Sequence, residues 1–430
     1  MTERPGKVWL VGAGPGDPGL LTLEGRRALE GCDAVLYDHL ANEELLAFAP
    51  AGAERIYVGK KKSDHAVAQL EIERLMIERA RQGKCVVRLK GGDPFIFGRG
   101  GEEAEALADA GIPFEVVPGV TAPLGIAAYA GVPLTHRDHN SMVTFVTGHD
   151  PESIDWRWAA GSETIVVFMG LTHTGEIAQR LIDAGVAPDT PAMAVRWGTR
   201  PQQKTIAAPL AELGAAVERA RLKPPATLII GAVVSLYPKL AWFERMPLFG
   251  QRIVVTRARE QSGGLAESLR RLGAEAIECP LIEMQPPADT SALDDAIERL
   301  RDFDWLVLTS ANAVRFFLER LDASRNDLRS LRARICAIGP ATRQAVEGLH
   351  LKVDLVPAEY VAEGLVAAFA PYDLAGARIL IPRAAVARDL VPQVLEQRGA
   401  KVEVVTAYRN VVPADATASV ERASLHRPIG

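Results

Sequence analysis

The sequence lacks the features that define several large classes of protein. Its four cysteines lie far apart and form no CxxC pair, so they predict reduced, mostly structural thiols instead of a disulfide framework. No apolar run approaches the roughly 18 residues of a membrane span. The first residues, MTERPGK, lead into a strand without the apolar core of a signal peptide. These absences together predict a cytoplasmic protein with no membrane partner.

A basic surplus is absent as well. The 430 residues carry a formal net charge of -5, which gives no support to nucleic acid as a partner. Hydrophobic residues make up 48% of the chain and charged residues 24%, as in ordinary globular proteins. The length favours two or three domains.

A complete dinucleotide fingerprint is also missing. The apolar run Val8–Val11 enters GAGPGDPG, which begins like the G-x-G-x-x-G motif. Asp17 stands where the third glycine belongs, and Pro15 lacks the N–H that a phosphate would use. We therefore reject a standard pyrophosphate loop and expect a turn that faces another kind of ligand.

The most informative stretch is RLKGGDPFIFGRGGEE, which covers residues 88–103. An apolar run at 85–87 predicts a buried strand before it, and its paired glycines would let a ligand approach the backbone. Asp93 offers an acceptor for an amino or hydroxyl group. Glu102 and Glu103 open a predicted helix, where the helix dipole favours acids. From spacing alone, a plain strand-to-helix turn explains the stretch equally well.

Strands alternate with helices on both sides of that stretch. The strand Ala34–Tyr37 ends on Asp38, and open α/β sheets place functional groups just past a strand's carboxyl end. A strand at 55–58 precedes three lysines from Lys60, for which a solvated loop is an equal alternative. The alternation predicts an α/β module with largely parallel sheets. Helices are predicted over 22–30, 42–48, 67–82, 102–109 and 175–184.

The run LTHRDHN brings together two histidines and an aspartate. His136, Asp138 and His139 have the donor atoms of a metal site, but no second cluster of such residues lies nearby in the sequence. We therefore expect no metal.

Residues 1–244 resemble the uroporphyrinogen-III C-methyltransferases of the tetrapyrrole methylase superfamily. The resemblance rests on VGAGPGDP, LYDHL, VGKK, RLKGGDPFIFGRGGEE, VPGVTA, AGVPLTHRDH, FMG and WGT. It implies a homodimer of two-domain α/β chains with S-adenosyl-L-methionine in the cleft between the domains. It also implies methylation of uroporphyrinogen III at carbons 2 and 7, which gives precorrin-2 for sirohaem or cobalamin.

The resemblance also assigns roles to residues. Asp38 matches the proton acceptor and Lys60 the proton donor, and a general base suits the proton that must leave the macrocycle. The substrate's carboxylates call for cations at Lys61, Arg88, Lys90, Arg99, His136 and Arg137. The sequence departs from the family at 62–64, which puts substrate contacts there in question. The implied cofactor contacts are Pro15, Gly91, Gly92, Asp93, Ile96, Thr121, Ala122, Met169, Gly198 and Ala226.

Residues 245–430 form a second region, and the part from 248 to about 412 is similar to uroporphyrinogen-III synthase. The resemblance rests on VTRA, LTSANAV, AIGPAT, LIPRA and TAYRN in that order. Members of that family close linear hydroxymethylbilane into uroporphyrinogen III between two α/β domains. The matching cleft positions are Thr309, Ser310, Thr342 and Tyr408. For Thr309 and Thr342, capping of the next helix is an equal alternative.

This second region departs from the synthase pattern. Its first domain would hold only the strands at 253–256 and 276–278, with a connector at 280–287, and the tail after Tyr408 contains no apolar strand. The sequence therefore predicts an incomplete two-domain synthase fold after the methylase, with little activity on hydroxymethylbilane. The alternatives are a methylase that acts on another precorrin or on RNA, and a second region that serves only for docking.

Overall fold

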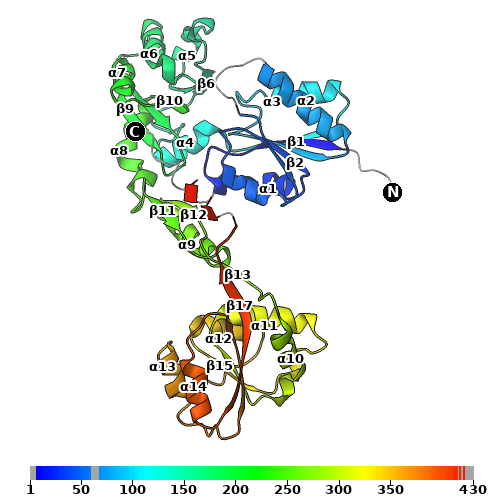
Figure 1. Cartoon of the computed structure of the whole chain (residues 1–430). Helices are drawn as coiled ribbons and strands as arrows, with labels where there is room; N and C mark the ends of the chain where they lie inside the picture. Colours follow the sequence, from blue (N-terminus) through cyan, green and yellow to red (C-terminus); the bar gives the residue numbers. More distant parts are fainter. Residues whose placement is uncertain (1–5, 60–66, 415, 418–419, 422–430) are drawn as a thin grey trace. The chain divides into compact units, whose positions relative to one another are not determined.

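The computed structural model describes residues 6–59, 67–414, 416–417 and 420–421 (Figure 1). The chain forms two compact units. The first comprises Met1–Ile253 with Ser268–Glu275, and the second comprises Val254–Glu267 with Ala276–Gly430.

The first unit opens with a parallel sheet of order β3-β2-β4-β1-β5. The strands form because their apolar runs are covered on both faces, as is usual for parallel sheets. Leu29 and Leu45 pack on one face, and Met76 and Leu107 pack on the other. The strands are β1 (Lys7–Gly12), β2 (Ala34–Tyr37), β3 (Glu54–Tyr57), β4 (Cys85–Lys90) and β5 (Phe114–Val117).

Three helices and one 3-10 helix supply those packing residues. The Thr22 hydroxyl caps α1 by accepting from the Gly25 N–H, and Asn42 caps η2 in the same way through Glu44. The predicted helix at 42–48 is therefore a 3-10 helix. The four elements are α1 (Leu23–Glu30), η2 (Glu43–Phe48), α2 (Val67–Arg81) and α3 (Gly100–Asp109).

The second sheet of this unit has the order β6-β7-β10-β8-β9, and only β6 and β7 are parallel. The prediction of largely parallel sheets was right for the first sheet and wrong for this one. The main reason is β10, which runs antiparallel to both β7 and β8. The edge strand β9 adds a third antiparallel pairing, with β8. The strands are β6 (Val143–Thr147), β7 (Thr164–Phe168), β8 (Pro191–Arg196), β9 (Lys204–Pro209) and β10 (Ala226–Gly231).

Helices cover both faces of this second sheet. Ile177 of α6 (Thr174–Asp183) and Leu213 of α7 (Leu210–Arg219) pack on one face. Ile126 and Ala127 of α4 (Ala122–Ala130) pack on the other. The short helix α5 (Trp156–Ala160) joins the first of these clusters through Trp156.

The second unit is built on a sheet of order β13-β17-β16-β14-β15. The strands β14, β15, β16 and β17 run parallel to one another, and β13 pairs antiparallel with the end of β17. The predicted connector at 280–287 therefore contains a strand. Its sequence, Glu-Met-Gln, carries almost no strand signal. The strands are β13 (Glu283–Gln285), β14 (Trp305–Leu308), β15 (Arg334–Ala337), β16 (Arg378–Ala384) and β17 (Lys401–Val411).

Two hydrophobic clusters hold helices on the faces of this sheet. Leu293, Phe317 and Val346 belong to one cluster, and Leu365 and Leu395 belong to the other. The helices are α10 (Ser291–Glu298), α11 (Ala311–Ala323), α12 (Pro340–Glu347), α13 (Ala362–Ala368) and α14 (Leu390–Gln397). The predicted strands β11 (Arg252–Val255) and β12 (Glu275–Glu278) form a separate two-stranded sheet, with α9 (Arg259–Arg271) between them in the sequence.

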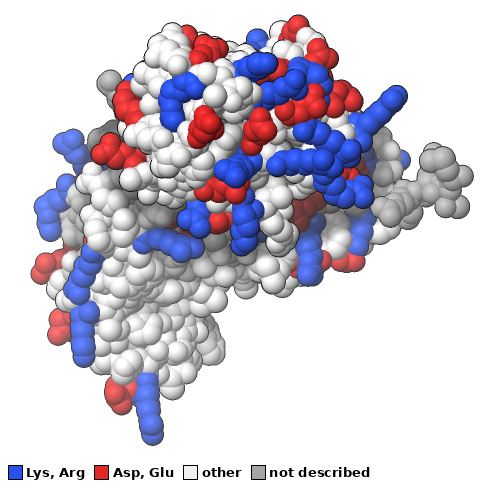
Figure 2. All heavy atoms as spheres, turned by 90° about the horizontal axis from the view of Figure 1, so that it is seen from below, with Lys and Arg blue, Asp and Glu red and all other residues white. Residues whose placement is uncertain are grey.

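All four cysteines are free thiols, as predicted. Burial raises the pKa of Cys336 to about 12, so this thiol is neutral at physiological pH. None of the helices in the described ranges is both long and apolar enough to cross a membrane. Figure 2 shows basic and acidic side chains interspersed on the face that it displays.

Candidate active site

A cavity of about 530 Å³ lies within the first unit, where the loops after several strands meet. The loops after β1, β2 and β4 contribute Gly14, Asp38 and Gly92, because the carboxyl ends of parallel strands share one edge of a sheet. From the second sheet, the residues after β7 and β8 contribute Met169 and Trp197. The cavity thus has walls from both sheets of the unit.

Glycine forms one wall of this cavity. The Gly92 N–H donates to the Gly14 carbonyl at 2.7 Å, and the Gly14 N–H donates back at 3.2 Å. Gly92 has φ +70°, which a residue with a side chain rarely adopts. A Cβ on Gly119 would lie 2.3 Å from the Gly92 carbonyl oxygen. The sequence GGDP thus supplies a wall of bare backbone that a ligand can approach closely.

Asp93 ties two of the loops together. One carboxylate oxygen accepts from the Phe95 N–H at 2.8 Å, and the other accepts from the Gly119 N–H at 3.0 Å. Both oxygens are therefore engaged by the chain's own backbone, although each keeps a further lone pair. The predicted role of Asp93 as an acceptor for a ligand stays a prediction.

Four ionisable side chains form a cluster beside the cavity, and three of them, Asp38, Arg88 and Lys90, line it. Arg88 Nη2 lies 3.1 Å from Asp38 Oδ2, and Arg88 Nε lies 3.2 Å from Glu103 Oε1. Lys90 Nζ lies 2.9 Å from the same Glu103 oxygen. Burial, and then the neighbouring Arg88 guanidinium, lower the pKa of Lys90 below its usual value. This group is named the buried charge cluster below.

The backbone around the mouth of the cavity is strained. Phe97, Met169 and Trp197 have φ between +49° and +54°, in the left-handed region that favours glycine. Phe97 and Met169 are exposed apolar side chains, and the Phe97 ring lies 4.8 Å from that of Phe168. Such strain often marks a functional site, because the surrounding structure must hold it in place.

All ten residues predicted to contact the cofactor line this one cavity, and so do Asp38, Lys90, Arg88 and Arg99. These residues come from seven separate stretches of sequence, between Pro15 and Ala226. Such convergence does not follow from composition. The roles of the individual residues remain predictions.

The other predicted substrate contacts of the first unit do not join this group. His136 and Arg137 are not among the residues that line the cavity. They belong to a turn in which the His136 N–H donates to Asn140 Oδ1 and the His136 ring faces that of His139. The predicted sites Lys60 and Lys61 lie outside the described residues. Arg88 is already bonded within the charge cluster, so the prediction that it binds substrate carboxylates loses support.

Several residues that line the cavity were not foreseen. They include Leu40, Gln69, Phe97 and Trp197. Leu40, Phe97 and Trp197 lie in the runs LYDHL, FIF and WGT, and these motifs could have indicated them. Gln69 sits on α2 without any motif, so nothing in the sequence pointed to it.

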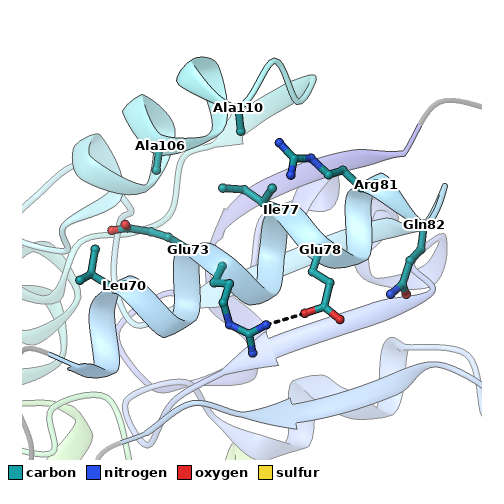
Figure 3. A pocket seen from close by; sticks show the side chains of 9 residues that line it. Leu70, Glu73, Ile77, Glu78, Arg81, Gln82, Ala106 and Ala110 are labelled. Atoms are coloured by element: carbon teal, nitrogen blue, oxygen red, sulfur yellow. Dashed lines mark hydrogen bonds and ion pairs between the residues drawn. The ribbon is translucent and has the colours of Figure 1, made fainter.

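A second depression, of about 680 Å³, lies on the outer face of α2 and α3 (Figure 3). Two of its charged side chains, Arg74 and Glu78, pair with each other at 2.9 Å. Leu70 and Ile77 add an apolar strip. None of the predicted site residues within the described ranges lines this depression.

In the second unit, the four predicted residues belong to elements near the carboxyl edge of its parallel strands. Thr309 and Ser310 follow β14, and Ser310, not Thr309, caps α11 by accepting from the Ala313 N–H. The Ser310 and Tyr408 hydroxyls lie 3.2 Å apart. Thr342 is buried in the first turn of α12, which has no side-chain cap. Helix capping therefore explains neither threonine.

Two family models match the chain. One, described as Tetrapyrrole (Corrin/Porphyrin) Methylases, matches residues 7–214, and the other, described as Uroporphyrinogen-III synthase HemD, matches residues 264–429. The chain is 39% identical over 427 residues to Porphyrin biosynthesis protein HemD of Ruminiclostridium josui, a match that covers 98% of this chain and 85% of that protein.

Two further relatives cover less of the chain. Uroporphyrinogen-III C-methyltransferase of Bacillus subtilis is 38% identical over 364 residues, which covers 83% of this chain and 74% of that protein. Siroheme synthase of Azotobacter vinelandii is 55% identical over 243 residues, which covers 56% of this chain and 52% of that protein. The chain thus spans about half the length of this last relative.

The fold, the cavity and these matches define a methyltransferase unit followed by a synthase-like unit. The chain belongs to the family in which a tetrapyrrole methylase is fused to a uroporphyrinogen-III synthase HemD region. The predicted family, the α/β fold class and the methyltransferase class are confirmed.

Proposed function

We propose that this chain transfers methyl groups from S-adenosyl-L-methionine to carbons 2 and 7 of uroporphyrinogen III, which gives precorrin-2. One observation carries the proposal. The ten residues predicted to bind the cofactor, and Asp38 as the predicted base, all line one cavity of about 530 Å³. The end product served, sirohaem or cobalamin, does not alter this chemistry.

The residues of the cavity fit the proposed cofactor. A Cβ on Gly91 would lie 2.5 Å from Leu40 Cβ, and one on Gly198 would lie 2.3 Å from Ile126 Cγ1, so both walls exist only as glycine backbone. Ile96 adds an apolar surface and Asp93 adds acceptor atoms. When bound, S-adenosyl-L-methionine supplies an electrophilic methyl carbon on a sulfonium. Because the transfer is an in-line displacement, the main task of these residues is to position the reactants.

Asp38 is held in a defined orientation at the cavity. Its Oδ1 accepts from the Leu40 N–H at 3.0 Å, and its Oδ2 accepts from Arg88 at 3.1 Å. The carboxylate still reaches the cavity, since its side chain is 21% exposed. In the proposed reaction Asp38 takes the proton that leaves the macrocycle after methylation. Lys60 remains the proposed proton donor.

Binding of the substrate's carboxylates requires cations that are not already buried in ion pairs. Arg99 lines the cavity, and its side chain is 54% exposed. Among the residues that the structure describes, it bonds only to Glu102, through an i,i+3 contact. A surface pair of this kind is weak and exchanges readily for another carboxylate. We therefore place the substrate's propionate or acetate groups at Arg99, on the rim beside Phe97.

The proposal is tested by incubating the chain with uroporphyrinogen III and S-adenosyl-L-methionine labelled in its methyl group. Two labelled methyl groups per macrocycle, with the absorbance of precorrin-2, are expected. Transfer to RNA or to a later precorrin, with none to uroporphyrinogen III, would replace this assignment with one of the two methylase alternatives.

For the second unit we propose hydroxymethylbilane as the ligand. The match of residues 264–429 to the HemD model and the proximity of Ser310 and Tyr408 support this. A binding titration with hydroxymethylbilane, run beside an assay of ring closure, separates a binding unit from an active synthase. A homodimer through the methylase unit is proposed as well, and sedimentation at several concentrations tests it.

A further inference from the structure

The buried charge cluster contains a residue to which the proposed chemistry assigns no task. Glu103 lies in the first turn of α3, and its side chain is 0% exposed. Its Oε1 bonds both Arg88 and Lys90, while its Oε2 has no hydrogen-bond partner among the described residues. Gln69 approaches Oε1 at 3.5 Å.

Packing alone does not explain a carboxylate in this position. Glu103 lies on the same helix as Leu107, which belongs to the hydrophobic cluster beneath α2 and α3. Desolvating a carboxylate is costly, and apolar replacement of a buried ion pair is often neutral or stabilising. An oxygen without a partner adds to that cost. The helix dipole favours an acid in the first turn, but the exposed Glu102 meets that preference without desolvation, so the burial of Glu103 needs another explanation.

The geometry of the cluster supplies one. Arg88 and Lys90 are two residues apart on β4, so both side chains point to the same face of the sheet. Glu103 contacts Arg88 through Nε, while Nη2 of the same guanidinium contacts Asp38. Because a guanidinium is a rigid plane, fixing Nε also fixes the direction of Nη2. By fixing the orientation of Arg88, Glu103 therefore also fixes the hydrogen bond from Nη2 of Arg88 to Asp38.

Charge balance points the same way. Asp38 and Glu103 carry two negative charges, and Arg88 and Lys90 carry two positive charges, so the four groups balance when all are ionised. Without the charge of Glu103, both cations would compete for Asp38 as their only carboxylate in the cluster. Asp38 would then be drawn toward β4 and away from the cavity.

We propose that Glu103 is a positioning residue for methyl transfer. It holds Arg88 and Lys90, and Arg88 in turn keeps Asp38 oriented toward the substrate. This inference rests on the proposed function of Asp38 as the base, and it adds a residue that touches neither reactant.

The test compares Glu103→Gln, which keeps the shape of the side chain, with Glu105→Gln at an exposed position of the same helix. Glu103→Gln is expected to lower kcat by about 10- to 100-fold, as misplacement of a reacting group does. The KM for uroporphyrinogen III and the affinity for S-adenosyl-L-methionine should change less than about threefold, because the cavity wall is intact. Glu105→Gln should behave as the wild type. Glu103→Asp should recover part of the lost rate.

A double variant separates positioning from a general structural role. If Glu103 acts through Asp38, then Asp38→Asn with Glu103→Gln should be no slower than Asp38→Asn alone. Multiplied losses, or wild-type turnover in Glu103→Gln, would overturn the inference. If Glu103→Gln does not fold, Glu103→Asp takes its place in the same cycle. A wild-type chain that does not methylate uroporphyrinogen III would instead refute the proposed function itself.

Discussion

The Tyr129 hydroxyl donates to a carboxylate oxygen of Asp17 across 2.5 Å, which joins α4 to the loop after β1. The backbone N–H of Asp17 donates to the Thr199 hydroxyl at 3.0 Å. One residue thus fastens the loop that carries Pro15 to the second sheet's side of the cavity. Sequence position gave no hint of this, because Tyr129 and Asp17 are separated by more than a hundred residues.

Tyr129→Phe is expected to destabilise the first unit by about 1 kcal/mol, the usual cost of removing a hydrogen bond to a partly buried acceptor. Burial, and then Asp17, raise the pKa of Tyr129 above its ordinary value. The stabilisation by the Tyr129–Asp17 hydrogen bond is therefore complete at pH values below the ordinary tyrosine pKa. It is lost only as the pH rises through the raised pKa of Tyr129. Urea unfolding at neutral pH measures the loss, with the exposed Tyr57→Phe as the control. Equal stabilities of the two variants would contradict it.

Gly92→Val is expected to weaken S-adenosyl-L-methionine binding by at least ~2 kcal/mol, because the side chain fills the approach and the backbone has φ +70°. Titration calorimetry on the folded variant measures the affinity. Gly101→Val is the matched control, since a Cβ on Gly101 meets no atom within 4 Å. Wild-type affinity in a folded Gly92→Val variant would rule out this wall as the cofactor site.

Asp38→Asn is expected to leave the affinity for S-adenosyl-L-methionine unchanged and to lower turnover by ~10²-fold or more, as loss of a general base does. The amide oxygen can still accept from Arg88 or Leu40, so the loop after β2 should keep its shape. Single-turnover transfer of labelled methyl groups measures the rate. Near-normal turnover would show that Asp38 only caps its loop.

The ion pair of Glu54 should make the stability of the protein depend on pH. Its bidentate hydrogen bonds from Arg79, followed by the bond from Lys84, lower the pKa of Glu54 from 4.5 to about 2. A lowered pKa means that the contribution is complete above the ordinary carboxyl pKa and is lost as the pH falls toward about 2. The Glu54 side chain is 37% exposed, so the solvent screens the ion pair. We therefore expect it to contribute only about 1 kcal/mol to the free energy of unfolding.

The measurement compares wild type and Glu54→Gln by urea unfolding between pH 7 and pH 3. The difference in stability should be constant at the upper end and shrink below about pH 4.5. Glu105→Gln should show no such trend. A difference that grows on acidification would contradict the assigned ion pair.

In the second unit, Tyr408 combines a ring stack with a hydroxyl contact. Its ring lies parallel to that of Phe316, with centroids 5.6 Å apart. Tyr408→Phe keeps the stack and removes the contact with Ser310, so it should cost only about 0.5–1.5 kcal/mol. Tyr408→Ala should cost about 3–5 kcal/mol, because it also empties part of the core. Thermal unfolding of the two variants gives the comparison, and equal losses would contradict this division.

The sequence was informative where a residue's neighbours along the chain decide its structure. The apolar runs of β1 and β4 predicted strands, and the glycines after them predicted a wall open to a ligand. The motifs also located ten residues that line one cavity. The sequence was uninformative where partners come from far away. Arg88 could be recognised as a cation, but its bonds to Asp38 and Glu103 depend on the packing of α3 and β2 against β4.

The remaining differences have similar causes. His136 and Arg137 have suitable chemistry, but their turn does not reach the lining of the cavity. The strand β13 forms because β17 offers it an edge, not because Glu283–Gln285 favours a strand. The antiparallel return of β9 likewise depends on its neighbour β8.

The left-handed backbone at Phe97, Met169 and Trp197 implies a conflict between durability and catalysis. A residue with a side chain pays on the order of 1 kcal/mol in that conformation, which glycine does not. Selection for heat resistance alone should therefore accumulate glycine at these three positions. Such variants would unfold at a higher temperature, but they would lose the apolar side chains around the cavity. Their turnover would therefore be lower.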